Sequence, residues 1–302
     1  MWRRDVEPVF MALMNDKPNS LRGIPCHMPV LATRKPAIEV PPGACDTHFH
    51  LFSKPFIDNP PYTPPDAGLA EYRNMINTLG IERAVIVQTV LPRDTSGALA
   101  ALRAANGRWR AIALPDPDVG DAQLQEMHAA GFCGVRFNPY YDAGTELRHL
   151  EAIVARIRPL GWHAQFHLDA RKLPALAPRL DRLGIEIVID HFGHMPPAAP
   201  ITEPGFQLML QWLREKRCWV KLSAPMRFAD ARPPYPSMTP FAQALIEAGP
   251  DRVLWGSDWP HVVFEGFMPN DADLLDLLAL WAPDAALRKK ILVDNPAALY
   301  GF

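Results

Sequence analysis

Six of the ten histidines in this sequence stand at the ends of short apolar runs that resemble buried strands, or just beyond them: His48, His50, His167, His191, His194 and His261. Imidazole changes its protonation state near neutral pH and is the commonest metal ligand in proteins. Barrels of parallel strands carry their catalytic groups at the carboxyl ends of the strands. The placement of these histidines therefore predicts one site at the strand ends.

The first of these runs contains Asp46-x-His48-x-His50. Residues two apart on a strand point to the same face, so we expect both imidazoles to project into the same space. A buried imidazole pair needs a metal, an anion or carboxylates to satisfy it. The alternative is a hydrogen-bonded pair in the core. We expect Asp46 to hydrogen-bond one imidazole and fix its tautomer.

A second candidate is Asp258, in the run Trp255-Gly-Ser-Asp-Trp-Pro-His261. The apolar walls formed by Trp255, Trp259 and Pro260 predict a raised proton affinity, which suits a general base. The alternative is an aspartate that caps a turn. His191 follows the sixth apolar run, and its alternative role is that of a hydrogen-bonded core histidine.

The elements that would position these residues alternate regularly. Eight apolar runs are separated by segments with helical spacing of apolar residues, which predicts a parallel sheet closed into a (β/α)8 TIM barrel. The rival is an open doubly wound sheet, but no G-x-G-x-x-G motif follows the first run. The eight runs span residues 44–52, 82–89, 110–115, 133–139, 163–169, 185–192, 218–225 and 252–260.

The distribution of proline predicts where the chain divides into an arm and a barrel. Much of the total of 33 lies in a few stretches, one of which covers residues 17–43. Proline fixes φ and removes a backbone donor, so these stretches are expected to be loops. We predict a proline-rich N-terminal arm over residues 1–42 and a (β/α)8 barrel over residues 43–302.

The charge balance of 31 basic and 33 acidic residues includes no run of one sign. This argues against nucleic acid and membrane surfaces as partners and favours a small-molecule substrate. No stretch approaches 18 apolar residues, and the four scattered cysteines are expected to be reduced. We expect a cytoplasmic protein. The oligomeric state and the role of the arm do not follow from the sequence.

Several motifs together resemble the amidohydrolase superfamily, and within it most closely the 2-pyrone-4,6-dicarboxylate lactonase group. The matching runs are Cys45-Asp-Thr-His-Phe-His50, Asp190-His-Phe-Gly193 and Trp255-Gly-Ser-Asp-Trp-Pro-His261. Further matches surround Tyr62 and Arg136 and include Asp294-Asn-Pro296. The resemblance spans about residues 40–302.

The resemblance implies a hydrolase that opens a small lactone, a cyclic carboxylic ester, at the barrel mouth. By position, Asp258 would activate water while His48, His50 and His191 polarise the carbonyl. The substrate would be bound by Arg136, Arg227, Tyr62, His261 and His194. Guanidinium groups suit carboxylates, whereas the alternative for either arginine is a surface salt bridge.

The sequence departs from this group at three positions. Asp142 and His194 stand where the lactonase has arginines, which argues against 2-pyrone-4,6-dicarboxylate itself as substrate. His167 stands where the metal-free lactonase has tyrosine. With His48, His50 and Asp258 it matches the pattern of mononuclear-metal relatives, in which His191 would act as acid or base. This set predicts a divalent metal, zinc by its ligand types, with an open position for water.

Two other functions stay open. Related barrels perform metal-dependent decarboxylation with a similar set of residues, so the release of carbon dioxide would separate that reaction from lactone hydrolysis. A non-catalytic binding protein on a barrel scaffold is the third possibility, since barrels host many functions.

Overall fold

The computed structural model describes residues 26–52, 62–91, 95–140, 145–228 and 232–302, and within them eight strands form one parallel sheet in chain order. Phe49 forms a parallel bridge with Trp259, and the His50 N–H donates to the Trp259 carbonyl at 2.8 Å. These contacts join the first strand to the end of the last, so the predicted barrel is confirmed. The strands are β1 (Cys45–Phe49), β2 (Arg83–Val87), β3 (Trp109–Ala113), β4 (Phe132–Phe137), β5 (His163–Phe166), β6 (Ile187–Ile189), β7 (Trp219–Ser223) and β8 (Val253–Gly256).

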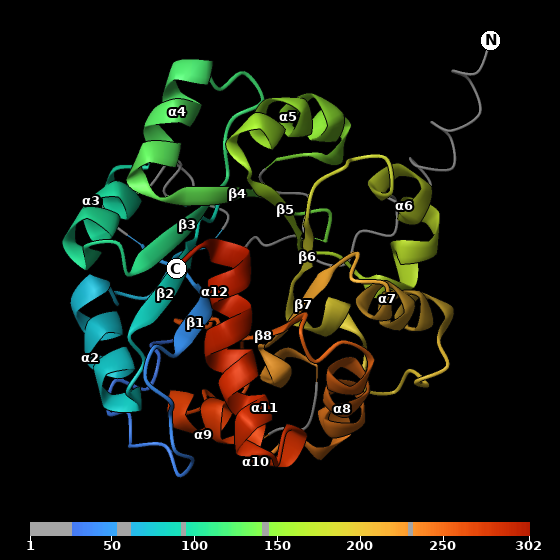
Figure 1. Ribbon diagram of the computed structural model, residues 1–302. Coiled ribbons are helices and arrows are strands. Elements are labelled where there is room, and N and C mark those ends of the chain that lie inside the picture. The colour runs from blue at the N-terminus through green and yellow to red at the C-terminus, as the bar shows by residue number, and fades with distance from the viewer. Residues whose placement is uncertain (1–25, 53–61, 92–94, 141–144, 229–231) are drawn as a thin grey trace.

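Helices surround the strands (Figure 1). Each of the larger helices turns an apolar stripe toward the barrel, as in α5, where Leu150, Ile153, Val154 and Ile157 are buried. The described helices are α2 (Leu69–Leu79), α3 (Ser96–Ala105), α4 (Asp121–Ala130), α5 (Leu150–Ile157), α6 (Leu173–Leu180), α7 (Pro204–Arg214), α8 (Thr239–Ala248), α9 (Asp271–Asp276), α10 (Leu278–Trp281), α11 (Ala285–Lys289) and α12 (Asn295–Tyr300).

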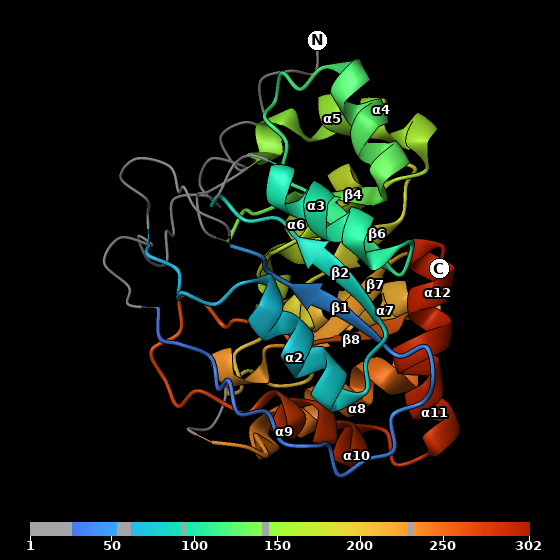
Figure 2. The same ribbon diagram turned by 90° about the vertical axis from the view of Figure 1, so that its left-hand side faces the viewer.

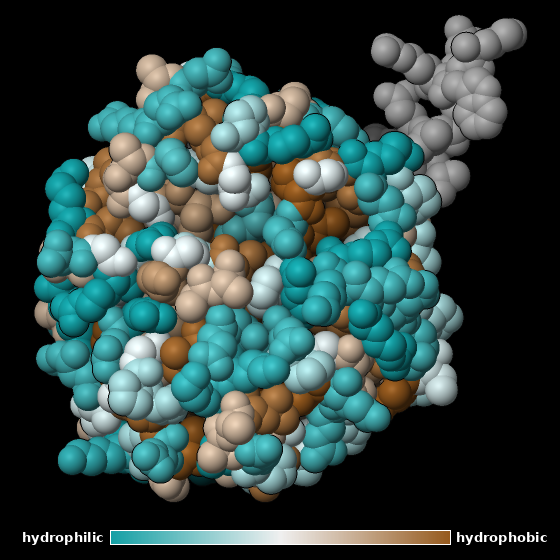
Figure 3. Space-filling model, in the orientation of Figure 1, coloured by the Kyte–Doolittle hydropathy of each residue, from teal (hydrophilic) through white to brown (hydrophobic). Residues whose placement is uncertain are grey.

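The two ends of the barrel differ. Figure 2 shows β1 and β2 pointing the same way, with α12 beyond the opposite end of the strands. At that end Tyr300 packs with residues near the strand starts, among them Cys45, Val85 and Trp219. Figure 3 shows this face as a surface filled by side chains across its centre. Tyr300 therefore covers the strand starts, while His50, His167, His191 and Asp258 follow the carboxyl ends of their strands.

The strands are shorter than the apolar runs predicted. His50, His167, His191 and Asp258 all lie just after a strand rather than on it. The apolar character of each run continues past the last ladder hydrogen bond, because the following residues are still buried in the barrel mouth. Apolar composition reports burial and cannot locate where pairing ends.

Residues 26–42 form neither helix nor strand and lie against α9. Arg34 pairs with Asp273 at 2.7 Å and with Asp276 at 2.6 Å. The main-chain N–H groups of Ala37 and Ile38 also donate to Asp276. The remainder of the predicted arm, residues 1–25, lies outside the described residues.

All four cysteines are free thiols, as the sequence predicted. In the described part of the chain, no helix combines the length and the apolar character needed to cross a bilayer.

Candidate active site

Three imidazoles converge on one carboxylate oxygen at the barrel mouth. The Oδ1 atom of Asp258 lies 3.4 Å from His50 Nε2, 3.7 Å from His48 Nε2 and 3.7 Å from His191 Nε2. All four side chains are buried. The Asp258 N–H donates to the His48 carbonyl at 2.8 Å, which fixes the end of β8 against β1. The residues to which the sequence assigned catalysis therefore lie together.

The other oxygen of Asp258, Oδ2, accepts two hydrogen bonds from Arg227, one from Nε at 2.9 Å and one from Nη2 at 2.6 Å. Burial alone would raise the pKa of Asp258, but Arg227 and the surrounding imidazoles hold it well below its usual range. The expectation of a raised proton affinity is wrong, because the sequence could not reveal that an arginine 31 residues away contacts the carboxylate. Arg227 also donates to the carbonyls of Val262 and Val263.

His191 begins the short 3₁₀ turn His191–His194. Three of its residues, His191, Phe192 and His194, have positive φ angles near 50° although none of them is glycine. Such conformations cost energy and concentrate at functional sites. The turn aims His191 into the mouth, where its Nδ1 lies 2.8 Å from the Ser223 hydroxyl. Sequence patterns did not indicate this backbone geometry.

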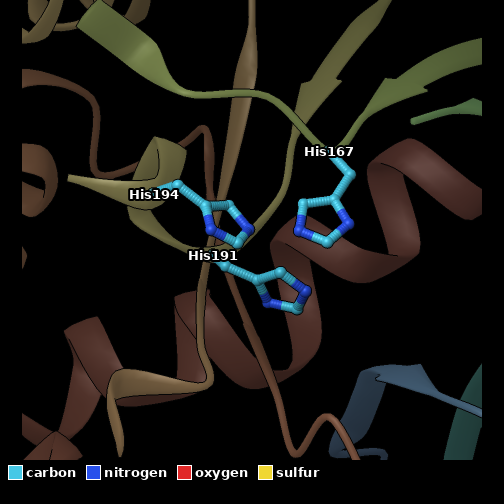
Figure 4. A group of neighbouring side chains, drawn as sticks. All are labelled: His167, His191 and His194. Carbon is cyan, nitrogen blue, oxygen red and sulfur yellow. The ribbon is translucent and has the colours of Figure 1, made fainter. Parts of the chain in front are cut away.

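A second histidine group lies beside the first. Figure 4 shows the rings of His167, His191 and His194 close together, and one nitrogen from each lies within 4.8 Å of the others. The His194 ring is tilted against two neighbouring rings, with its centroid 4.2 Å from that of His167 and 4.1 Å from that of Tyr140. Burial lowers the pKa of His194 to about 3, so the ring is neutral at pH 7. Neither of its ring nitrogens has a hydrogen-bond partner among the described residues.

The predicted metal ligands are divided between two groups. His48, His50 and Asp258 form one set of potential ligands, whereas His167 belongs with His191 and His194. Arg136 Nη2 lies 3.0 Å from His167 Nδ1. Because a guanidinium only donates, that nitrogen must accept, and the proton of neutral His167 is on Nε2. The side chains needed for a divalent-ion site are present, but His167 does not join the other three.

Asp46 lies beside the site and plays a different part from the one expected. It accepts hydrogen bonds from Ser257, the Tyr72 hydroxyl and the main-chain N–H of His48, and it bonds no imidazole within the described residues. The predicted contact with a ring is therefore wrong. Asp46 ties β1 to the residue that follows β8. Burial raises its pKa to about 6 against the effect of these donors.

The imidazole of His48 has other partners, which the sequence analysis missed. Its Nδ1 lies 3.3 Å from Asp190 Oδ1 and 3.3 Å from Lys221 Nζ. Asp190 directly precedes His191, and Lys221 interrupts an apolar strand, so each carried a signal in the sequence. A charged residue within a buried strand requires a partner inside the barrel.

Three residues predicted to bind substrate are now located. Arg136 is buried and donates from Nε to Asp190 at 3.1 Å. Tyr62 packs with Phe52, and burial raises its pKa above the usual range. His261 is fully buried, with Nε2 3.2 Å from Asp271 at the start of α9.

This fold and these strand-end residues define an amidohydrolase. The family model described as Amidohydrolase matches residues 45–302, and the chain belongs to that family. The resemblance inferred from the motifs is confirmed.

The chain is also similar to two hydrolases and to a solved structure. It is 39% identical to the 4-sulfomuconolactone hydrolase of Hydrogenophaga intermedia over 87% of this chain and 90% of that protein. It is 36% identical to the 2-pyrone-4,6-dicarboxylate hydrolase of Comamonas testosteroni over 88% of this chain and 92% of that protein. A crystal structure from Agrobacterium tumefaciens in the apo form matches with a TM-score of 0.82 and 28% identity, covering 90% of this chain and 98% of that one.

Proposed function

We propose that this protein is a hydrolase that opens a small lactone bearing an acid group by attack of water at the barrel mouth. The names of the two hydrolase relatives support this class of substrate. The observation that carries the proposal is the convergence of His48, His50 and His191 on Asp258, which puts a base beside several groups able to polarise a carbonyl.

In the reaction, Asp258 holds the attacking water and accepts its proton. Arg227 keeps the carboxylate ionised and fixes its orientation through two hydrogen bonds. His191 and His48 are neutral because burial lowers the pKa of each ring, and a ring N–H donates to the carbonyl oxygen as it gains charge. The water oxygen bonds to the carbonyl carbon, the ring C–O bond breaks, and the ring oxygen takes the proton that Asp258 accepted, which gives an open-chain acid and restores the carboxylate.

The acid group of the substrate would be bound by Arg136 and His194, with Tyr62, His261 and Arg227 nearby. His194 has two buried nitrogens with no partner in the described chain, and the neutral ring with its proton on either nitrogen can donate to an anionic oxygen. Asp142, the acidic departure from the lactonase pattern, lies outside the described residues. We propose a monocarboxylate, or a diacid with different spacing, rather than 2-pyrone-4,6-dicarboxylate.

A divalent ion, which we propose to be zinc, fits part of this site. His50 Nδ1 lies 2.8 Å from the Val87 carbonyl, so it carries the proton, and the lone pair of Nε2 faces Asp258 Oδ1 at 3.4 Å. Two acceptors that face each other require a cation or a proton between them. His50 and Asp258 would hold the ion, joined by His48 when its proton is on Nδ1. Such an ion would polarise a carbonyl and lower the pKa of bound water to about 7.

The test is turnover by Asp258→Asn over a panel of lactones, each offered as the free acid and as its ester. We expect kcat to fall at least about 10²-fold with the fold intact. Asp294→Asn, which removes an exposed carboxylate, is the matched control. Assays with and without chelator, after elemental analysis, report on the metal, and detection of carbon dioxide would indicate a decarboxylase instead. Near-normal turnover by folded Asp258→Asn would refute the role of Asp258.

A further inference from the structure

Lys221 is a fully buried lysine on β7 inside the barrel, directly beneath the site. Its ammonium group donates to the Thr47 carbonyl at 2.9 Å and to Gln165 Oε1 at 2.9 Å. The third contact is His48 Nδ1 at 3.3 Å. An ammonium has three protons to donate and no lone pair, so this contact requires Nδ1 of His48 to accept.

Asp190 competes for the same ring nitrogen. Its Oδ1 lies 3.3 Å from His48 Nδ1 and 3.5 Å from Lys221 Nζ, while Oδ2 accepts from Arg136 and Gln165. A carboxylate only accepts, so a hydrogen bond to Asp190 would require the proton on Nδ1. His48 therefore has two possible tautomers, each favoured by one of two neighbouring charged groups.

The choice of tautomer decides what His48 can do. With Nδ1 accepting from Lys221, the proton is on Nε2, and His48 is a donor to a substrate oxygen. With Nδ1 donating to Asp190, Nε2 has a lone pair and is a metal ligand, as when a carboxylate supports a zinc-bound histidine. The Nε2 atom has no hydrogen-bond partner among the described residues, and the ionised Asp258 Oδ1 that faces it at 3.7 Å favours the same tautomer as Lys221.

We propose that Lys221 is a positioning residue that holds His48 with its proton on Nε2, so that His48 donates to the lactone carbonyl and is a poor metal ligand. The catalytic role of Lys221 rests on the proposed lactone hydrolysis. Its effect on the tautomer of His48 is a property of the protein without substrate. Two observations favour Lys221 over Asp190. The contact of Lys221 Nζ with His48 Nδ1 meets hydrogen-bond geometry, whereas the contact of Asp190 Oδ1 with the same nitrogen, also at 3.3 Å, does not meet the angular requirement for a ring N–H donor. His167 has the same arrangement, with Arg136 donating to its Nδ1.

The direct test is the tautomer of His48 in metal-free protein, read from two-bond proton–nitrogen correlations of the histidine rings. We expect the proton of His48 on Nε2 in the unaltered protein. In Lys221→Met we expect it on Nδ1, from which it can be donated to Asp190. His50 is an internal control, because the Val87 carbonyl holds its proton on Nδ1 in both proteins. A proton on Nδ1 of His48 in the unaltered protein overturns the proposal, and that measurement needs no variant.

Two further measurements separate positioning from a merely structural role. Lys221→Met should lower kcat about 10–100-fold with little change in KM, and it should bind Zn²⁺ at least about 10-fold more tightly by calorimetry, in the range typical of groups that orient metal ligands. In Lys221→Ala, added ethylammonium should restore turnover. Lys290→Met, at the surface, is the control.

Unchanged zinc affinity in a folded Lys221→Met protein, or a fall in affinity, overturns the proposal. If no lactone is hydrolysed by the unaltered protein, the proposed function fails, whereas the tautomer and the zinc affinity still decide the role of Lys221.

Discussion

Arg227→Met should move the acid limb of the pH profile of kcat/KM upward. Arg227 is the main group that offsets the burial of Asp258. With charge centres about 4 Å apart and an effective dielectric constant of about 20, the pair interaction is about 4 kcal/mol. At 1.36 kcal/mol per unit, this corresponds to an upper limit of about 3 pKa units. The Arg227 side chain is 13% exposed, so screening reduces the effect, and we expect a rise of roughly 1–3 units.

The direction follows from the active form of Asp258, which is the carboxylate. Its lowered pKa keeps it ionised as the pH falls, so in the unaltered protein activity is lost only at pH values well below the usual aspartate range. Without Arg227 the carboxylate takes up a proton at higher pH, and the loss of activity moves with it.

The assay is initial rate against pH at substrate concentrations well below KM. Arg252→Met is the matched control, because Arg252 also pairs with a carboxylate, that of Glu186, but lies before the start of β8. An acid limb at the same pH in folded Arg227→Met and in the unaltered protein would show that Arg227 does not control the ionisation of Asp258.

The remaining predictions concern stability and substrate recognition. Asp46 has a pKa of about 6 in the folded state and about 3.9 when unfolded, so the folded state binds more protons between these values. Its contribution to the free energy of unfolding therefore falls as pH rises from 4 to 6, by up to about 3 kcal/mol. Buried histidines such as His48 change stability in the opposite direction over this range, so the measurement is the difference in urea stability between Asp46→Asn and the unaltered protein. This difference should change by the same amount between pH 4 and 6, and a difference that stays constant contradicts the assignment. Gly256→Ala would put a Cβ 2.7 Å from His48 Cβ, so we expect the free energy of unfolding to fall by about 1–3 kcal/mol and activity to be lost. Gly120→Ala, with open space around it, should leave stability unchanged. Equal stability of these two variants in urea would refute the close approach. Arg136→Met should raise KM for an acid-bearing lactone and spare its neutral ester; equal effects on both would assign Arg136 to the support of Asp190 and His167.

The sequence was sufficient for the barrel because its signals are local and repeated. Each apolar run predicts a buried strand without reference to any other part of the chain, and the alternation with helices then determines the architecture. The site residues were found for a related reason. Strand order in a closed barrel brings His48, His191 and Asp258 to one end whatever the details of the loops.

The contacts between side chains were beyond the sequence. Which oxygen of Asp258 faces Arg227, which group lies behind each imidazole and why His167 belongs with His194 all depend on distances across the barrel. These contacts set protonation and tautomer, so the chemistry of each residue was less predictable than its location. Lys221 illustrates the limit, because its position in an apolar strand was visible but its partner was not.

The segment over residues 26–42 is attached to the barrel by two kinds of contact that respond differently to salt. Arg34 is held by the partly buried carboxylates of Asp273 and Asp276 on α9, whereas Ile38 and Val40 pack against the apolar core. Raising the ionic strength to about 1 M shortens the Debye length to about 3 Å, which weakens the charged contacts, while salts such as sulfate strengthen apolar burial. In concentrated ammonium sulfate the charged contacts of Arg34 would therefore weaken, while the apolar contacts of Ile38 and Val40 would strengthen.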